Sequence, residues 1–378
     1  MDFSWTEKQL ALYEEAVAFG RSELSPKALA EKSSMRAIWA QLAEIGATGL
    51  NIPSEYGGKG LSALDTARVL EGLGYGAGTT GHLFGLCAHL FGAAAPLMAF
   101  GDEAQKKRWL PGLAGGSLIG ALAVTEPGAG SSPAEMVTQA ILEGDSYRLN
   151  GEKCYITNAP YADLFVVSAS TDPQRGAGGL SSFVIESGTE GIEVAEPSPK
   201  MGLYPAEMSQ LLLSDCRVQK ESRLSEEGRG SACFGEAMLW ERALILAPRI
   251  GALRHHLDAC VEFARDRRQG GRRIGHYQGV SHRIAKMAVK IEAAQSLLYR
   301  AAWSLDHRKD AGKYATMAKY FIGEVAVEVH LDVIQVFGGR GYLQETGVEG
   351  ELRDAVGGLI HSGTAEMQLN IIAGHLGL

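Results

Sequence analysis

The chain has 378 residues, of which 46% are hydrophobic and 21% charged, and its formal net charge is −8. A chain of this length can form two or three domains, or one large layered unit, around a sizeable core. The acidic balance excludes a general nucleic-acid binder, which needs a basic surface to neutralise phosphates.

The cysteines and the apolar stretches indicate where the protein works. Five cysteines are scattered without the CxxC spacing of zinc or redox sites, so we expect a reducing compartment, no disulfides and no metal centre. The residues from Met1 to Glu7 lack a basic segment followed by an apolar run, so no signal peptide is expected. The apolar stretch 83–100 is interrupted by His89 and is short for a membrane span. We therefore expect a cytoplasmic protein without a membrane partner.

Three zones of composition predict an α+β fold. Residues 1–118 have apolar side chains every three or four positions, as at Leu10, Tyr13 and Val17, which predicts an N-terminal helical domain. Residues 119–226 contain short β-rich runs between turns rich in Gly, Pro and Asp, which predict a small central β-sandwich or barrel. In residues 227–378 the helical period returns in longer segments, which are typical of a four-helix bundle.

Individual elements can be placed within these zones. The predicted strands are 147–149, 154–157, 164–168, 182–185 and 211–213. The predicted long helices are 236–268, 278–307 and 313–337. The last of these helices ends at Gly338 and Gly339, where glycine provides a suitable C-cap.

Five short stretches carry the chemistry. They are 123–131 (AVTEPGAGS), 150–158 (NGEKCYITN), 267–278 (ending IGHYQ), 335–342 (QVFGGRGY) and 362–366 (SGTAE). In this order they resemble the motifs of the acyl-CoA dehydrogenase family, and the resemblance runs from Trp5 to the C-terminus. It implies the helix–β–helix fold described above, an FAD cofactor, oxidation of an acyl thioester and a homo-oligomer, most simply a tetramer.

The first two motifs resemble the part of the family that surrounds the flavin ring. The resemblance implies that Val124, Thr125 and Ser131 contact the flavin or the thioester tail, and that Gly130 lets the backbone approach the ring. It also implies that Tyr155 packs on the ring and that Thr157 bonds near flavin N5. The Gly-Ala-Gly turn taken alone would equally fit an ordinary connection between strands.

The remaining motifs resemble contacts to the rest of FAD. Arg267 and Gln278 match residues that grip the pyrophosphate of a neighbouring subunit, for which a guanidinium is well suited. The segment under the adenine end is matched by Gln335, Gly338 and Gly339, and the last flavin-contacting turn by Thr364 and Glu366. Without the resemblance, the basic cluster at 265–273 would be read as a solvated helix end.

The position of the catalytic base distinguishes branches of the family. Dehydrogenation of a thioester requires one carboxylate to take the α-proton while the β-hydride leaves to the flavin. Most members carry this glutamate where the chain has Ser362, which cannot act as the base. The isovaleryl-type branch carries it on a long helix before an arginine, which matches Glu241 and Arg242 here. We therefore predict Glu241 as the base, against the alternative of an exposed Glu–Arg surface pair.

The substrate pocket is less clear from the sequence. The resemblance places the following residues at the substrate: Ser131, Arg242, His361, Ser362 and Gly363. His361 adds a bulky polar group to the pocket floor, and it is either a structural hydrogen-bonding residue or a sign that the acyl group is itself polar, such as an amino acid.

Three functions follow from these patterns. The first is a dehydrogenase of short or branched acyl-CoA. The second is an oxidase or dehydrogenase of an acyl or aminoacyl group on a carrier protein, as in the prolyl-carrier oxidases of this family. The third, of a different class, is a flavin-binding scaffold that has lost catalysis. Electron-transfer flavoprotein or oxygen would be the electron acceptor of the enzyme.

Overall fold

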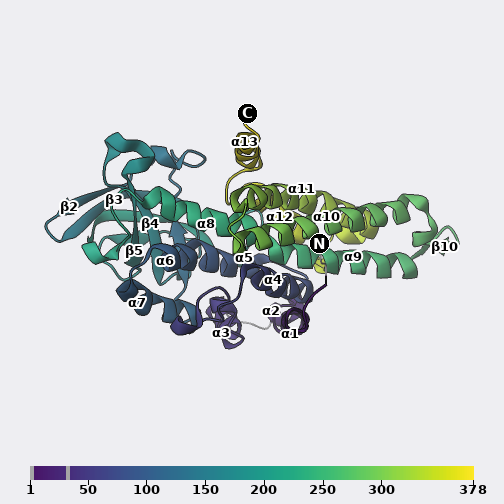
Figure 1. Cartoon of the computed structure of the whole chain (residues 1–378). Helices are drawn as coiled ribbons and strands as arrows, with labels where there is room; N and C mark the ends of the chain where they lie inside the picture. Colours follow the sequence, from purple (N-terminus) through teal and green to yellow (C-terminus); the bar gives the residue numbers. More distant parts are fainter. Residues whose placement is uncertain (1–3, 31–34) are drawn as a thin grey trace.

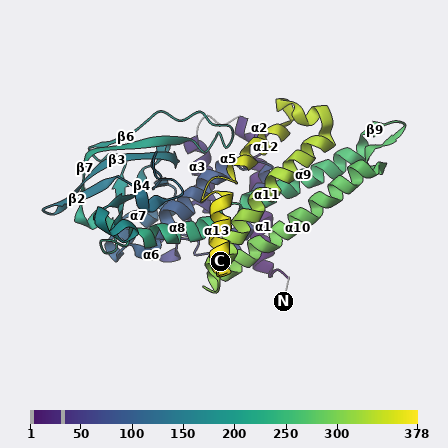
Figure 2. The same ribbon diagram turned by 90° about the horizontal axis from the view of Figure 1, so that it is seen from above.

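The computed structural model describes residues 4–30 and 35–378. Met1 to Phe3 lie outside the described residues. They are part of the segment in which no signal peptide is expected. Helices come first, a sheet second and longer helices last, which confirms the α+β fold. The sheet lies at one end of an elongated molecule, and the hairpin of β9 (Arg268–Gln269) and β10 (Arg272–Arg273) lies at the other, in two perpendicular views (Figure 1, Figure 2).

The N-terminal part is helical. Its α-helices are α1 (Glu7–Glu23), α2 (Pro26–Ala30), α3 (Met35–Glu44), α4 (Ala63–Ala77), α5 (Gly81–Cys87), α6 (Ala95–Phe100) and α7 (Glu103–Ala114). Two of them begin at capping boxes, formed by Thr6 with Gln9 and by Asp102 with Gln105. Each box satisfies two N–H groups that would otherwise lack a partner at the helix start.

Helix α5, a π-helical turn (Ala88–Ala94) and α6 form one continuous apolar stretch, Gly81–Phe100. Among the described residues this is the one helix long and apolar enough to cross a membrane, and 78% of its most apolar window is buried inside the protein. His89 in the π-helical turn accepts a hydrogen bond from Gly120 N–H at 3.0 Å. The stretch therefore supports the first strand of the sheet, as a core helix does.

The central part is one mixed sheet. Its strands are β1 (Gly120–Ala123), β2 (Gln139–Glu143), β3 (Ser146–Thr157), β4 (Leu164–Ser170), β5 (Leu180–Glu186), β6 (Ile192–Val194), β7 (Met208–Gln219) and β8 (Arg223–Leu224). The order is β6-β7-β3-β2-β4-β5-β8, and β1 pairs in parallel with β4. A single pair, Gln139 with Ser170, joins β2 to β4, so the sheet folds there into two halves.

The two halves enclose a shared core, as predicted for a β-sandwich. Tyr147 of β3 meets Phe183 of β5 edge-on, with ring centroids 4.9 Å apart. One prediction is wrong: 147–149 and 154–157 are not two strands but parts of β3. Shifts of register between Leu149 and Gly151 and between Lys153 and Ile156 disturb the alternation without ending the strand.

The C-terminal part is a bundle of long helices. Its elements are α8 (Gly230–Leu244), α9 (Ala247–Asp266), β9 (Arg268–Gln269), β10 (Arg272–Arg273), α10 (Gln278–Asp306), α11 (Ala311–Phe337), α12 (Val348–Gly357) and α13 (Ala365–His375). Helices α10 and α11 agree with the predicted segments to within two residues. The predicted single helix 236–268 is wrong, because the helix is interrupted between α8 and α9. Pro248 starts the second helix and has no N–H to continue the first.

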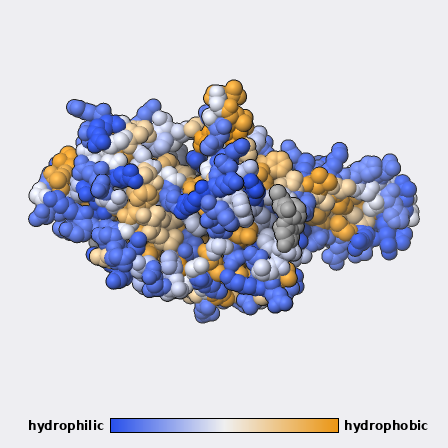
Figure 3. Space-filling model, viewed as in Figure 1, coloured by the Kyte–Doolittle hydropathy of each residue, from blue (hydrophilic) through white to orange (hydrophobic). Residues whose placement is uncertain are grey.

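Helix α13 packs against α11, projects from the bundle and presents apolar side chains to solvent (Figure 1, Figure 3). Gln368 is buried, whereas Leu369 is 46% exposed. Leu376, just beyond the helix, is 62% exposed.

A buried carboxylate ties the N-terminal helices to the bundle. Glu71 of α4 is fully buried and accepts hydrogen bonds from Arg254 of α9 at 2.8 Å and from Gln295 and Tyr299 of α10. The helices approach so closely that a Cβ on Gly251 would lie 2.0 Å from the Glu71 carbonyl oxygen. One side chain therefore fixes the positions of three helices.

Replacing Glu71 with alanine should destabilise the protein strongly. The variant leaves several donors without an acceptor and Arg254 without its counter-charge, and breaking such a pair costs about 3 kcal/mol or more. Differential scanning calorimetry would show a drop in Tm of several degrees. Glu15→Ala, at an exposed position of α1, is the matched control and should change stability by about 0.5 kcal/mol or less. Equal Tm values for the two variants would contradict this role.

Candidate active site

Glu241 lies on α8 and faces the interior. Glu241 is only 7% exposed, so the alternative of an exposed Glu–Arg surface pair is wrong. The hydroxyl of Ser362 donates to Glu241 Oε2 at 2.6 Å. On the other side, a Cβ on Gly92 would lie 3.1 Å from Glu241 Oε1 and 3.0 Å from Leu122 Cβ. Glycine at 92 therefore makes room for the carboxylate beside β1.

The environment of Glu241 suits a base that works near neutral pH. Burial raises its pKa to about 7, against the opposing effects of the Ser362 hydrogen bond and the charges of Arg242 and Lys319. A carboxyl with this pKa is partly ionised at pH 7 and more basic than an exposed one.

The turn after α12 brings its backbone to the base. Ser362 and Gly363 both have positive φ, at 55° and 91°. The carbonyl of Ser362 accepts from Gln368 Nε2 at 3.0 Å and Arg242 Nε at 3.4 Å. The carbonyl of Gly363 accepts from Gln368 Nε2 at 2.9 Å and from Lys319 Nζ. These donors hold a strained turn in one conformation.

The N–H groups of the turn differ from its carbonyls. Within the described part of the chain, neither Ser362 N–H nor Gly363 N–H donates a hydrogen bond. Backbone N–H groups beside a base can stabilise negative charge on a substrate oxygen.

Lys319 and Gln368 were not predicted as site residues. Lys319 is buried on α11, and burial together with the charge of Arg242 lowers its pKa to about 8. In the sequence Lys319 is part of an ordinary helical pattern. The one available signal of a role in the site was that a lysine occupies an interior position of the helix.

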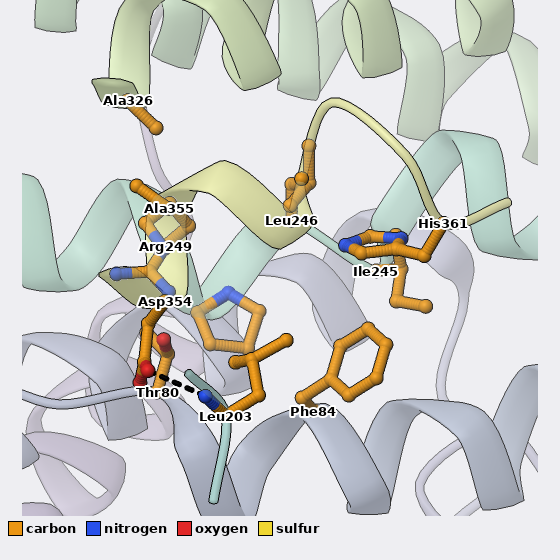
Figure 4. A pocket seen from close by; sticks show the side chains of 12 residues that line it. Thr80, Phe84, Leu203, Ile245, Leu246, Arg249, Ala326, Asp354, Ala355 and His361 are labelled. Atoms are coloured by element: carbon orange, nitrogen blue, oxygen red, sulfur yellow. Dashed lines mark hydrogen bonds between the residues drawn. The ribbon is translucent and has the colours of Figure 1, made fainter. Parts of the chain in front are cut away.

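His361 lies on the other side of Ser362. Its Nδ1 is 3.3 Å from Ser362 Oγ, and its ring packs against Phe84 with centroids 4.6 Å apart. The ring borders a small cavity of about 20 Å³, which Figure 4 shows from close by. Ser362 therefore links the base to a histidine that borders this cavity.

The first motif is held on the sheet by a buried ion pair. Lys153 Nζ lies 2.7 Å from Glu126 Oε1, and both residues are almost fully buried. Glu126 also accepts from the N–H groups of Val137 and Thr138, at 2.6 and 3.0 Å. The pair fixes the turn that carries Thr125, whose carbonyl accepts from Cys154 N–H at 2.9 Å. Both residues of the pair lie in predicted motifs, but neither was assigned a role.

Next to this turn, β3 turns Tyr155 outward. The strand is irregular between Lys153 and Ile156, and Tyr155 has a φ of 60°. Its side chain is 68% exposed, unlike the buried neighbours on either side. Such an irregularity redirects a side chain that regular pairing would bury.

The predicted residues form three groups in one chain. Strand β3 and the turn after β1 carry Val124, Thr125, Gly130, Ser131, Tyr155 and Thr157. Helix α8, the turn after α12 and the start of α13 carry Glu241, Arg242, His361, Ser362, Gly363, Thr364 and Glu366. The third group, at the hairpin end, is Arg267, Gln278, Gln335, Gly338 and Gly339.

The first two groups lie side by side, and the third does not. Gly92 lies against both Glu241 and Leu122, each about 3 Å from where its Cβ would stand, so the base lies near the strand that leads into Val124. The third group begins after α9, whose 20 residues span about 30 Å. Phe263 near the end of α9 stacks on Phe337 at the end of α11, which gathers Arg267 with Gly338 at that far end.

Comparison with known proteins agrees with the motifs. Residues 6–117 match the N-terminal domain of acyl-CoA dehydrogenase, residues 121–216 its middle domain and residues 228–377 its C-terminal domain. The chain belongs to the acyl-CoA dehydrogenase family. The resemblance, the fold class and the FAD cofactor expected from the sequence are thereby confirmed.

Similar family members have carrier-bound substrates in their names. The chain is 42% identical over 341 residues, 90% of each protein, to the L-prolyl-peptidyl-carrier-protein dehydrogenase of Pseudomonas fluorescens. The crystal structure of the prolyl acyl carrier protein oxidase AnaB has a TM-score of 0.96 and 39% identity, covering 99% of this chain and 100% of that one. The structure of PigA with FAD and proline has a TM-score of 0.97 and 38% identity, covering 100% of both chains.

The residues on the sheet fit a flat aromatic cofactor. Tyr155 offers an exposed ring face, and a Cβ on Gly128 or Gly130 would meet no atom within 4 Å, so the turn leaves space for a ligand. Val124, Thr125, Ser131 and Thr157 would hold the flavin of FAD at this place, beside Glu241. The individual contacts stay predictions.

The pKa of Glu241 predicts a rate that depends on pH. The value of kcat/KM should rise about tenfold per pH unit below pH 7 and level off above it, because only the ionised carboxylate takes a proton. Ser362→Ala removes a hydrogen bond that favours the ionised form, so the apparent pKa should rise further.

The test compares the two enzymes across the pH range. The variant-to-wild-type ratio of kcat/KM cancels any titration of the substrate, and it should be lower at pH 6 than at pH 9. Ser117→Ala, at an exposed serine, is the control and should leave the ratio near one at every pH. A ratio for Ser362→Ala that does not vary with pH would show that the hydroxyl does not act on the base.

Proposed function

We propose that the protein dehydrogenates an aminoacyl group, with prolyl as the first candidate, held as a thioester on a carrier protein. The observation that carries this proposal is the chain of contacts from Glu241 through Ser362 to His361, which sets a polar ring two hydrogen bonds away from the base. The names of the similar proteins supply the prolyl group and the carrier.

In this proposal Glu241 takes the α-proton of the aminoacyl thioester. The C–H electrons then form the α,β double bond as the β-hydrogen leaves as hydride. FAD, when bound, supplies the hydride acceptor. The thioester oxygen gains negative charge as the proton leaves, and the N–H groups of Ser362 and Gly363 are the available donors for it. We propose electron-transfer flavoprotein or oxygen as the final electron acceptor.

Glu241→Gln should lose dehydrogenation while keeping FAD. The amide preserves size and can still accept from Ser362, but it cannot take a proton, and removing a general base costs about 10² to 10⁴ in rate. Anaerobic stopped-flow measurement of flavin bleaching with a prolyl-carrier thioester gives the rate directly. Bleaching by Glu241→Gln at the wild-type rate, together with its loss in His361→Ala, would show that the base is misassigned.

The same assay tests the substrate class. Wild-type protein is mixed with prolyl-carrier, other aminoacyl-carrier and short or branched acyl-CoA thioesters, and the fastest bleaching identifies the substrate. Fastest bleaching with prolyl-carrier supports the proposal, whereas preference for an acyl-CoA restores the acyl-CoA function. A flavin that no thioester bleaches would instead support the scaffold hypothesis.

We also propose that two chains build each FAD site. The hairpin end with Arg267 lies a helix length away from Tyr155 of the same chain, so one chain does not surround a ligand with both. A second copy whose hairpin end reaches the sheet and α8 resolves this separation. The exposed apolar face of α13 and Leu376 supports self-association.

Arg267→Ala should lower FAD content without unfolding the protein. Arg267 is exposed in the single chain, so its removal leaves no cavity and no buried partner without a contact. Ultrafiltration followed by flavin absorbance would show weaker FAD retention, whereas circular dichroism should be unchanged. Arg36→Ala, which removes another exposed arginine, is the control. A fully active monomer by light scattering would contradict the two-chain site.

A further inference from the structure

Helix α8 leads from the base to the surface of the protein. Phe234 lies seven residues, about two turns, before Glu241, so both side chains are on the same face of the helix. An apolar cluster around the turn after β1 is flanked by Phe234 at one end and at the other by Leu122, which lies near the base. Both flanking side chains are only half-buried, and the turn is exposed at Gly128 and Gly130. A strip of accessible apolar surface therefore runs from the base towards the start of α8.

Two exposed arginines lie at the outer end of this strip. Arg229 directly precedes α8, and Arg175 is on the loop 171–179 that follows β4. Nη1 of Arg175 is 3.7 Å from where a Cβ on Gly228 would stand. The loop is tied to α8 by Ser231, whose hydroxyl donates to the carbonyl of Ala177 at 2.5 Å. The two guanidinium groups therefore belong to one end of the helix.

Neither arginine forms an ion pair with another described residue. Of the two glutamates that lie between them and the sheet, Glu227 pairs with Arg223 at 3.4 Å. Glu226 is then the one neighbouring carboxylate in the sequence, so Arg175 and Arg229 leave this end of α8 with a positive excess. A guanidinium offers a fork of N–H donors that matches a phosphate group. The end of α8 is therefore suited to a phosphate ester.

The distance from the base to the arginines matches the length of a phosphopantetheine arm. Arg229 and Glu241 are 12 residues apart, which corresponds to about 18 Å along the helix axis. About 15 covalent bonds separate the phosphorus of the arm from the α-carbon of its thioester, and an extended chain of that length spans about 17 Å. An α-carbon beside Glu241 thus brings the phosphate to the end of α8.

An apolar cleft lies next to Arg175. It has a volume of about 170 Å³, and its lining includes Ile141 and Leu142 of β2, Pro173 of the loop, and Glu227. Ile141 and Leu142 are both half-exposed. Protein partners bind through a few apolar side chains that fill such pockets, with charged groups at the rim. The cleft therefore provides a place for a side chain of a protein that holds the arm.

We propose that a carrier protein docks on this surface, with the phosphodiester of its arm on Arg175 and Arg229 and an apolar side chain in the cleft at Ile141 and Leu142. This inference rests on the proposed function, because the thioester on the arm has to reach Glu241. The arm follows the strip along α8, and the body of the carrier stays outside. The arginines then govern how well the carrier is captured and not how fast the α-proton is removed.

The kinetic test compares prolyl-carrier with prolyl-pantetheine, a thioester without phosphate or protein, in the FAD-loaded enzyme. The double variant that combines Arg175→Ala with Arg229→Ala should lose about 10- to 100-fold in kcat/KM with prolyl-carrier, because hydrogen bonds to a charged group are removed. Its bleaching rate at saturating prolyl-carrier and its kcat/KM with prolyl-pantetheine should stay at the wild-type values. Arg21→Ala, at an exposed arginine of α1, is the control.

A binding measurement separates the carrier from its arm. Calorimetric titration of the FAD-loaded protein uses a carrier with an unreactive prolyl-amide arm, and the free prolyl-phosphopantetheine amide. The double arginine variant should bind both ligands about 10-fold or more weakly. Leu142→Ser should weaken the binding of the carrier alone, because the free arm does not fill the cleft. Circular dichroism checks that each variant is folded.

The outcomes separate this inference from the function itself. Weaker binding of both ligands in the arginine variant, with a loss confined to the carrier in Leu142→Ser, supports the docking surface. A carrier Kd that the arginine variant leaves unchanged overturns it and keeps the proposed function, because the carrier then docks elsewhere. A carrier Kd unchanged in Leu142→Ser also overturns it, and leaves a phosphate site that coenzyme A could equally occupy. Wild-type flavin that prolyl-carrier does not bleach overturns the proposed function and the inference together.

Discussion

The exclusion of water from one carboxylate determines how this site works. Glu241, on α8, lies between the strand β1 and the turn at 362. Burial there disfavours the ionised form of the carboxylate. A single close hydrogen bond, from Ser362, offsets part of that cost. The nearby cations act on it through charge rather than by direct contact. The result is a carboxyl basic enough to take a weakly acidic proton, yet ionised in part at neutral pH.

Because the base is on α8 and not at position 362, the turn at 361–363 can do other work in the site. With the acid on α8, position 362 needs only a hydroxyl, and a small residue leaves space beside it. His361 lies in that space, linked to Ser362 and packed on Phe84. The positive φ values of the turn are tolerated because Gln368 and Lys319 bind its carbonyls. Base and pocket thus share one set of supports.

Much of this arrangement could be predicted from the sequence because it lies in contiguous motifs. The three zones and the long helices α10 and α11 rest on local patterns of residues, whereas the prediction of Glu241 as the base rests on the resemblance to the family. The helix break before Pro248 was missed because apolar periodicity continues across it. The continuity of β3 was missed because its irregular pairing interrupts the alternation that marks a strand.

The supports of the site could not be predicted in the same way. Gly92, Lys319 and Gln368 each stand in an ordinary helical pattern, and their roles depend on contacts with residues far away in the sequence. The sequence left two interpretations of His361 open, because the neighbouring residues do not show which atoms its ring faces. Local patterns identify the residue that carries the chemistry, whereas packing identifies the residues that make the chemistry possible.

The charges around Glu241 also explain why the site can stabilise both ends of a proton transfer. In the proposed reaction the negative charge is on Glu241 before the transfer and on the thioester oxygen of the substrate afterwards. The total charge of the site is unchanged, so Arg242 and Lys319 can favour both states without moving. Their side chains are already fixed on the carbonyls of Ser362 and Gly363. Because those bonds fix the two charged side chains, the field is set before the substrate arrives, which is the condition for electrostatic stabilisation without reorganisation.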